Sequence, residues 1–312
     1  MAKIITVFGA TGGQGGGVVS ALLKAIARGE PYAVRAVTRK PDGDKAKKLK
    51  SRGCEIVVCD LDDKGSVEQA IKGSYGVFLV TNYWEHFSME KEVEQGKRVI
   101  DVCEALGVKH LIYSGLENVK KAIGIECAHF DGKGMVEEYL HTKKLKERLP
   151  FTIVRFPFYY NNLVSFFTPR KKDDGTLLYD IPMEGVAMDG IDVTQGGECV
   201  YGVLESPDCY RFKTIGLSGD KITIQQYCET LTKHLEDKGL KFEDSKITLD
   251  EYRAQPDNPA AIELGNMFEF YKRGNPDRDI KLTKKLNEET QRFDVWVREN
   301  KAMLEEAFTK ER

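Results

Sequence analysis

The sequence has 312 residues, of which 41% are hydrophobic and 31% are charged, and its formal net charge is −2. This length and composition fit a globular protein with one large α/β domain and a smaller lobe. The near-neutral charge argues against a nucleic-acid-binding protein that relies on bulk electrostatics. No apolar run approaches the roughly 20 residues that a membrane-spanning helix needs, so we expect neither a nucleic-acid nor a membrane partner.

The cysteines and histidines indicate the compartment. The seven cysteines are odd in number and include no Cys-x-x-Cys spacing, so we expect reduced intracellular thiols rather than a disulfide framework. The five histidines are scattered along the chain, and we expect no metal site. The first predicted strand begins at the N-terminus, so we expect no cleavable signal peptide. These features favour a cytoplasmic protein, with access to the nucleus left open.

The most informative motif follows the first predicted strand, Ile4–Phe8, and leads into an apolar-periodic helix that runs to about Ala27. Its first glycine permits a tight turn, its second lets the backbone approach a pyrophosphate, and its third lets the helix pack closely on the strand. The unpaired N–H groups at the start of that helix would face the phosphates. The motif predicts dinucleotide binding by Gly9, Ala10, Thr11, Gly12, Gly13, Gln14 and Gly15.

Strand and helix patterns alternate through the first half of the chain. The predicted strands after the first are Ala33–Thr38, Glu55–Cys59, Val77–Val80, His110–Ser114 and Phe151–Arg155. The predicted helices are Asp44–Arg52, Ser66–Ile71, a helix capped by Ser88 that runs to about Leu106, and Gly132–Leu149. Strands separated by helices imply right-handed crossovers and a parallel sheet. We therefore expect an α/β fold with a Rossmann-type, doubly wound parallel sheet.

The pattern becomes irregular after Pro157, which predicts a smaller C-terminal α/β lobe. The predicted elements there are the aromatic, partly helical segment Tyr159–Phe167, the turn Lys171–Gly175, the strand Thr214–Leu217, and helices at Asp192–Leu204, Thr223–Leu235, Ala260–Tyr271 and Phe293–Phe308. We expect a cofactor-binding domain at residues 1–155 and the lobe at residues 156–312, with some segments at about 190–220 returning to the sheet. Ligands would bind at the carboxyl edge of the sheet, beneath the lobe.

The end of the second strand indicates which dinucleotide binds. An NAD site places Asp or Glu there, to bond the ribose 2′-hydroxyl, whereas this strand ends in Arg39 and Lys40. A charge-assisted hydrogen bond from Arg39 to a 2′-phosphate is worth about 1.5–3 kcal/mol, which corresponds to roughly a 10- to 100-fold preference for NADP(H). The alternative is that both bases begin the solvated basic face of the next helix, an interpretation that we favour for the lysines from Lys45 onward.

Two further strand ends hold candidate contacts. Asp60 closes the third strand and can lie beside the adenine, or it can be a turn residue. Thr81, Asn82 and Tyr83 close the fourth strand, where a ribose or nicotinamide passes, and their alternative role is loop capping.

A catalytic group is less evident. Short-chain dehydrogenases use a serine after the fifth strand and then Tyr-x-x-x-Lys on the next helix. This chain has Ser114 and, fifteen residues later, His129 in the tyrosine's place, followed by Lys133. Imidazole titrates near about 6.5 and a phenol near about 10, so His129 is no direct replacement for the tyrosine. We expect Lys133 to bind the nicotinamide ribose.

Two alternatives concern the same helix. Lys133 can instead be a surface lysine paired with Glu137 at i+4. A literal Tyr139-x-x-x-Lys143 also exists, but Tyr139 lies about 240° round the helix from Lys133, and we interpret this motif as a chance match.

Several runs together resemble the NmrA-like family of atypical short-chain dehydrogenases/reductases, in particular its members that act as NADPH sensors. These runs are Gly9–Gly15, Val37–Arg39, Thr81–Glu85, Tyr113–Asn118, His129–Gly134, Asn266–Phe268 and Pro276–Ile280. The resemblance covers essentially the whole chain. It implies a nucleotide-binding protein that lacks the dehydrogenase tyrosine and acts mainly as a redox-responsive regulator.

The resemblance also implies binding residues. Besides the glycine run, the NADP(H) contacts carried over by position are Arg39, Lys40, Asp60, Leu61, Thr81, Asn82, Tyr83, Lys133, Tyr159, Tyr160, Asn161 and Asn162. The last four would wall the nicotinamide end, although the residues alone suggest aromatics that pack the lobe. In one departure, the family's sensors carry a lysine at the position of Glu94, so a basic contact is lost unless Lys91 or Lys97 substitutes.

Two functions follow. The first is an NADP(H) sensor without dehydrogenase activity, whose cofactor shifts the conformation or a monomer–homodimer equilibrium and so controls a regulatory protein client, for which the resemblance implies argininosuccinate synthase. The second is an NADPH-dependent reductase of a small carbonyl, quinone or enone, in which Ser114 orients the oxygen and Lys133 or His129 supplies the proton. The replacement of the tyrosine by His129 favours the sensor, and enzymatic activity stays open.

Overall fold

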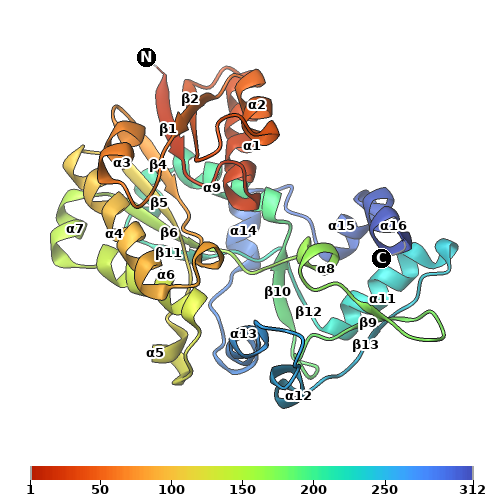
Figure 1. The fold of residues 1–312 in the computed structure, drawn as a ribbon. Helices are drawn as coiled ribbons and strands as arrows, with labels where there is room; N and C mark the ends of the chain where they lie inside the picture. The colour runs from red at the N-terminus through yellow and green to blue at the C-terminus, as the bar shows by residue number, and fades with distance from the viewer. Residues whose placement is uncertain (1, 311–312) are drawn as a thin grey trace.

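The computed structural model describes residues 2–310, except for the side chains at positions 143, 144 and 146. A parallel seven-stranded sheet organises the N-terminal part (Figure 1), and its strand order is β11-β6-β5-β4-β1-β2-β3. Its strands are β1 (Lys3–Val7), β2 (Tyr32–Thr38), β3 (Glu55–Val58), β4 (Gly76–Leu79), β5 (His110–Gly115), β6 (Phe151–Arg155) and β11 (Thr214–Gly216). The predicted Rossmann-type, doubly wound fold is confirmed.

Helices cover both faces of this sheet. One apolar core lies between the sheet and α1 (Gly13–Ala27), α2 (Asp44–Ser51) and α9 (Val193–Glu205). The other lies between the sheet and α3 (Lys64–Ile71), α4 (Met89–Ala105), α6 (Ala128–Leu140) and α7 (Lys143–Arg148). The short helix α5 (Val119–Ile123) follows β5. Although α9 and β11 come late in the chain, α9 packs on α1 and β11 extends the sheet beyond β6.

The C-terminal lobe has a core of its own, built from aromatic and aliphatic side chains. Its two small sheets have the orders β12-β10-β7 and β13-β9-β8. Their strands are β7 (Phe158–Tyr159), β8 (Arg170–Lys171), β9 (Leu177–Tyr179), β10 (Met188–Ile191), β12 (Asp220–Ile222) and β13 (Phe242–Asp244). The helices that accompany these strands are α8 (Asn162–Ser165), α11 (Ile224–Leu235), α12 (Leu249–Arg253), α13 (Ala261–Arg273), α15 (Phe293–Glu299) and α16 (Lys301–Thr309). Two more helices, α10 (Pro207–Tyr210) and α14 (Ile280–Leu286), contact α9.

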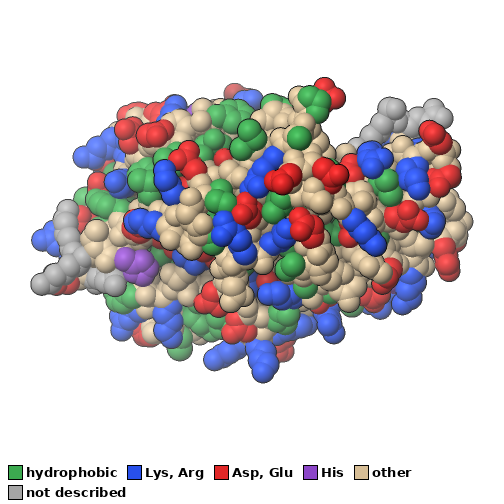
Figure 2. Space-filling model, turned by 90° about the horizontal axis from the view of Figure 1, so that it is seen from below, with side chains coloured by type: hydrophobic (Ala, Val, Ile, Leu, Met, Phe, Trp, Pro, Cys, Tyr) green, Lys and Arg blue, Asp and Glu red, His purple; other side chains and the backbone are tan. Residues whose placement is uncertain are grey.

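The surface carries both signs of charge. Figure 2 shows Lys and Arg interspersed with Asp and Glu over the face seen from below. Over the residues that the structure describes, no helix combines the length and the apolar character that crossing a membrane requires.

Local capping signals place most helix starts as predicted. The Ser88 hydroxyl accepts the N–H of Lys91 at 3.1 Å at the start of α4, and Asp192 accepts the N–H of Thr194 at 2.9 Å at the start of α9. Thr223 and Gln226 form a reciprocal capping box at α11. Such side chains satisfy the N–H groups that have no partner within the first helical turn.

Two predicted helices are wrong in extent. The helix predicted at Gly132–Leu149 begins at Ala128 and ends at Leu140, and α7 is separate. It begins early because Glu263, 134 residues away, accepts the N–H of His129 at 2.8 Å, a cap that local sequence cannot reveal. The helix predicted at Phe293–Phe308 divides at Asn300, whose side-chain amide donates to the carbonyl of Trp296 at 2.9 Å. The helix α14 and several short strands were not predicted.

A buried ion-pair network ties the lobe to the large sheet. The Arg278 guanidinium donates to both carboxylate oxygens of Glu117, at 2.6 and 3.1 Å, and Arg155 lies 3.3 Å from the same carboxylate. Arg155 also donates to Glu137 at 3.0 and 2.6 Å. Burial raises the pKa of Glu117, but Arg278 and Arg155 outweigh it, so the pKa is lower than usual. Because breaking a buried pair is strongly destabilising, this network holds the lobe over the carboxyl edge of the sheet.

Candidate functional site

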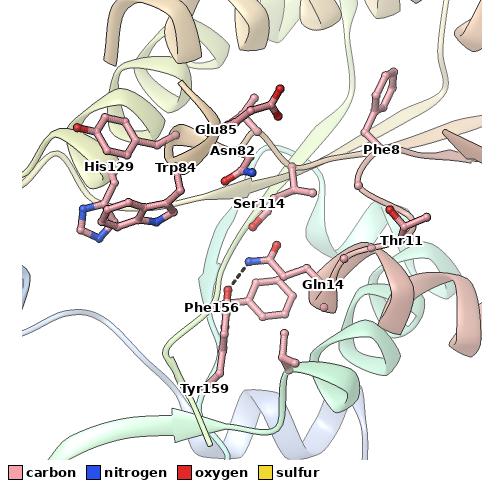
Figure 3. A pocket seen from close by; sticks show the side chains of 18 of the residues that line it. Phe8, Thr11, Gln14, Asn82, Trp84, Glu85, Ser114, His129, Phe156 and Tyr159 are labelled. Carbon is pink, nitrogen blue, oxygen red and sulfur yellow. Dashed lines mark hydrogen bonds between the residues drawn. The ribbon is translucent and has the colours of Figure 1, made fainter. Parts of the chain in front are cut away.

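A cavity of about 1120 Å³ lies at the carboxyl edge of the large sheet, and both the sheet and the lobe contribute to its wall. Figure 3 shows Phe8 and Thr11 toward one end of it, and His129 beside Trp84 toward the other. The lobe contributes Leu264, Met267 and Tyr271. In open α/β sheets, ligands bind in this crevice outside the strand ends.

The glycine run forms the turn between β1 and α1. Gly9 has φ +67°, in the left-handed region that favours glycine, and a Cβ on Gly15 would overlap the carbonyl of Gly9. The N-cap of α1 is Gly12, and in the described structure no side chain caps this helix or places an acid in its first turn. The first N–H groups of α1 are therefore available to an anion, as the sequence predicts.

Arg39 stands at the end of β2, in the cavity wall next to Lys40. Its guanidinium forms an ion pair with Glu85, on the 3₁₀ turn η1 (Tyr83–Glu85). Both side chains are partly exposed, at 56% and 37%. Lys45 is exposed, as expected for the solvated face of α2, and it also lines the cavity, where its ammonium donates to the carbonyl of Thr11 at 3.2 Å.

The ends of β3 and β4 supply the next part of the wall. Asp60, Leu61, Thr81, Asn82 and Tyr83 all line the cavity. Asp60 also accepts the N–H of Asp62 at 2.9 Å, so it is a turn residue and a wall residue at once.

Lys133 reaches the cavity from α6 and is held by three acceptors. Its ammonium donates to the carbonyl of Thr81 at 2.9 Å and to the Thr81 hydroxyl at 3.0 Å, and it forms an ion pair with Glu92. The Thr81 hydroxyl in turn donates to Glu92 at 2.8 Å. Glu92 is fully buried, whereas 12% of the Lys133 side chain is exposed. The alternative pairing with Glu137 is wrong, since Glu137 binds Arg155.

Ser114, at the end of β5, and His129, in the first turn of α6, both line the cavity. The Nδ1 atom of His129 lies 2.5 Å from Oε1 of Glu263. Burial raises the pKa of Glu263, but the hydrogen bonds from His129 outweigh it, so the pKa is lower than usual. The imidazole is thus held by a carboxylate, an arrangement that fixes its tautomer and orientation.

Tyr139 is not part of this cavity. Its hydroxyl donates to Asp101 on α4 at 2.5 Å, which agrees with its interpretation as a chance match. The side chain of Lys143 lies outside the described part of the structure.

The segment after Pro157 divides between the cavity and the lobe. Tyr159, Asn161 and Asn162 line the cavity, and the Gln14 amide donates to the Tyr159 hydroxyl at 2.5 Å (Figure 3). Tyr160 is fully buried and packs on Phe293 and Trp296. The expectation that Tyr160 contacts a cofactor is therefore wrong, because its ring faces the core of the lobe.

Ala10 also differs from expectation. Its side chain is buried in the core beneath α1 and is no part of the cavity wall. Thr11, the next residue in the turn, lines the cavity.

The position of Glu94 leaves the cavity without a substitute base. Glu94 is exposed and outside the wall. Lys91 pairs with Asp62 at 2.7 Å, and the Lys97 ammonium lies 5.2 Å from the centre of the Tyr139 ring. Neither lysine lines the cavity, so neither is placed to supply the basic contact that the resemblance implies.

Aromatic and apolar residues that sequence analysis missed close the end beyond Lys133. The Trp84 ring lies 4.9 Å from the His129 ring and 6.1 Å from the Phe166 ring. Phe167, Leu264 and Met267 complete this end. Phe166 and Phe167 belong to the segment that the sequence marks as aromatic, but no local signal groups them with Trp84, Leu264 and Met267, which come from elements far apart in the chain.

Comparisons with known proteins agree on one family. A protein-family model described as the NmrA-like family matches residues 1–296 of this sequence. An NmrA-like family domain-containing protein of Dictyostelium discoideum is 31% identical over 75% of this chain and 78% of its own length. The NmrA-like family domain-containing oxidoreductase malD of Malbranchea aurantiaca is 32% identical over 73% of this chain and 71% of its own.

Solved structures have the same fold. NmrA, a negative transcriptional regulator, in complex with NADP has a TM-score of 0.79 at 18% identity, with 99% of this chain and 98% of that one covered. The NADPH-dependent quinone oxidoreductase QOR2 of Escherichia coli, complexed with NADPH, has a TM-score of 0.73 at 21% identity, with 94% and 98% covered.

The buried pair of Lys133 and Glu92 generates the first prediction. Lys133→Met leaves the Glu92 carboxylate buried without its cation, and we expect a loss of about 3–5 kcal/mol in the free energy of unfolding. Urea denaturation of the free protein measures it. Adding Glu92→Gln to Lys133→Met should recover most of the lost free energy of unfolding. A single variant as stable as the wild type would contradict the pairing.

Proposed function

The chain belongs to the NmrA-like family, and from this premise we propose that it binds NADP(H) and acts as a redox-responsive regulatory protein. The single observation that carries the proposal is the ion pair between Arg39 and Glu85. It joins the predicted 2′-phosphate site to the segment that holds Tyr83 and Trp84 at the other end of the cavity.

The donor set suits this cofactor. The uncapped start of α1 offers N–H groups to a diphosphate, and Arg39 offers a fork of donors to a 2′-phosphate. Lys133 would exchange one of its three acceptors, the two Thr81 oxygens and Glu92, for a hydroxyl of the nicotinamide ribose. Asp or Glu, which would favour NAD(H), is absent from the end of β2. NADP(H), when bound, would supply a hydride donor or acceptor.

We propose that Arg39 changes partners when a 2′-phosphate binds. A phosphate carries more negative charge than one carboxylate, so Arg39 would exchange Glu85 for the phosphate. The segment Tyr83–Phe87 would then lose its tie to β2. Phe87, at the end of this segment, has φ +54° and is 66% exposed, so backbone strain and apolar exposure are already concentrated there.

A ligand shifts a conformational equilibrium only by its differential affinity for the two states. Cofactor at 100 times its dissociation constant would stabilise the bound state by about 2.7 kcal/mol. That free energy is enough to change whether a partner surface around Phe87 is presented.

Arg39 and Glu85 give opposite predictions for affinity. Arg39→Ala should weaken NADPH binding by roughly 10- to 100-fold and leave NADH binding little changed. Glu85→Gln removes the competing carboxylate and should strengthen NADPH binding. Glu94→Gln, an exposed glutamate on the following helix, is the matched control. Calorimetric titration measures all of these, and equal affinity of the wild type for NADPH and NADH would refute the 2′-phosphate assignment.

The conformational part is tested through tryptophan fluorescence. The chain has two tryptophans, and Trp296 is buried in the lobe whereas Trp84 lines the cavity. In a Trp296→Phe background, NADP⁺ should change the Trp84 emission by more than NAD⁺ does at equal saturation. With Glu85→Gln, the cofactor-free emission should already approach the bound value. An emission that neither cofactor nor substitution alters would exclude movement of the segment.

A reductase is the second candidate, favoured by His129, Ser114 and the apolar end of the cavity. Relatives that carry the name oxidoreductase add support. Ser114 would orient a carbonyl or quinone oxygen, and His129, held by Glu263, would supply the proton. NADPH oxidation against a panel of quinones and aldehydes tests it. Turnover above about 1 per second, a normal enzymatic rate, would favour the reductase, and its loss in His129→Ala would assign the proton donor.

We also propose that cofactor occupancy controls two associations, the binding of a protein client and the formation of a homodimer. Argininosuccinate synthase is the client that the family resemblance suggests. Co-purification and light scattering, each with and without NADPH, measure the two associations. If NADPH changes neither association, the proposed control of protein partners by the cofactor is refuted.

A further inference from the structure

Cys127, His129 and Glu263 converge between α6 and α13, next to the cavity. Sγ of Cys127 lies 3.6 Å from Nδ1 of His129 and 3.8 Å from Oε1 of Glu263. Nδ1 and Oε1 are 2.5 Å apart. Within residues 2–310, this is the one group of three or more Cys, His, Asp or Glu side chains whose ligand atoms come this close together. We propose that these three side chains bind a divalent transition-metal ion of the zinc type.

Two of the three distances between the ligand atoms fit tetrahedral coordination of an ion. Zinc lies about 2.3 Å from a thiolate sulfur and about 2.0–2.2 Å from nitrogen and oxygen ligands, which puts sulfur about 3.6 Å from each of the other two ligand atoms. The observed sulfur distances are 3.6 and 3.8 Å. Only the distance between Nδ1 and Oε1 does not fit, since it is about 0.9 Å shorter than the separation of two tetrahedral nitrogen and oxygen ligands. These two atoms now share a hydrogen bond, and their separation would increase when a metal ion replaces the shared proton.

The chemistry of the set also suits such an ion. A thiolate and an imidazole select zinc over magnesium or calcium. The thiolate and the carboxylate together offset two positive charges, which matters because the positive end of α6 opposes a lone cation. The three ligands would leave the fourth position to water, as in zinc sites with three protein ligands. Glu263, 21% exposed, gives the ion a path to solvent, while Cys127 is fully buried.

The Cys127 thiol has to lose its proton to become a metal ligand. Burial, and then the nearby Glu263, raises the pKa of Cys127 well above its usual value, so an ion that binds here would displace the thiol proton. A coordinating metal ion deprotonates a thiol outright. Without an ion, the three groups form only a hydrogen-bonded cap on α6, and the experiment distinguishes that outcome.

The site would connect the two parts of the molecule. Cys127 and His129 belong to the start of α6, and Glu263 belongs to α13 of the lobe. The scattered histidines and the missing Cys-x-x-Cys spacing predict no metal site. Glu263 lies 134 residues after His129, so no local spacing joins it to Cys127 and His129. Cys127 and Glu263 lie outside the cavity wall, whereas His129 lines it, so metal binding and NADP(H) binding are measured separately.

Cobalt(II) titration of the untagged, metal-free chain tests the site. We expect one cobalt ion per chain, with tetrahedral visible bands and a thiolate-to-cobalt charge-transfer band in the near ultraviolet. Zinc should displace cobalt and raise the melting temperature. Cys127→Ser should abolish the charge-transfer band and weaken zinc binding by at least about tenfold, whereas the matched control Cys209→Ser, at an exposed cysteine, should behave as the wild type.

Glu263→Gln covers the case in which Cys127→Ser does not fold, since it keeps the side-chain volume and one oxygen acceptor. It should weaken zinc binding by a similar factor. Calorimetry with NADPH reports separately whether each variant keeps the cofactor cavity. Absence of stoichiometric cobalt binding in the wild type, or zinc binding of wild-type strength in Glu263→Gln, would overturn the site and leave the proposed cofactor function untouched.

Discussion

Two of the cations that line the cavity, Arg39 and Lys133, are paired with carboxylates that follow β4. Glu85 pairs with Arg39, and Glu92 pairs with Lys133. The two pairs differ in burial, since Glu85 is 37% exposed and Glu92 is fully buried. An exposed pair contributes little to stability and can exchange partners, whereas a buried pair is costly to break. The exposed pair can therefore respond to a ligand while the buried one keeps Lys133 in place.

This asymmetry explains why one segment can couple the two ends of the cavity. The chain between β4 and α4 carries Glu85 toward β2 and Trp84 toward His129. Its far end is anchored by Glu92 inside α4 and by the cap that Ser88 provides. The short stretch between these anchors holds Glu85, so a change at Arg39 would reach Tyr83, Trp84 and Phe87 first.

The sequence predicts those features that depend on neighbours in the chain. Alternation of strands and helices, the glycine turn, the cap at Ser88 and the helix starts near Asp192 and Thr223 are local, and the structure confirms them. Contacts between distant segments are not local. Lys133 binds Glu92 rather than Glu137, and the start of α6 depends on Glu263. Both were missed because a helical period predicts i+4 partners and cannot predict a partner on another element.

The two roles open to His129 exclude each other through Nδ1. As a proton donor in a reductase, the imidazole needs Nδ1–H held by Glu263 so that the ring can carry and release a second proton. As a metal ligand, Nδ1 would hold the ion, and the ring would stay neutral with its remaining proton on Nε2. Occupancy by zinc would then suppress acid catalysis while it tightens the contact between α6 and α13. Turnover that falls as zinc is added, and recovers in Cys127→Ser, would mean that both roles exist and compete for one nitrogen.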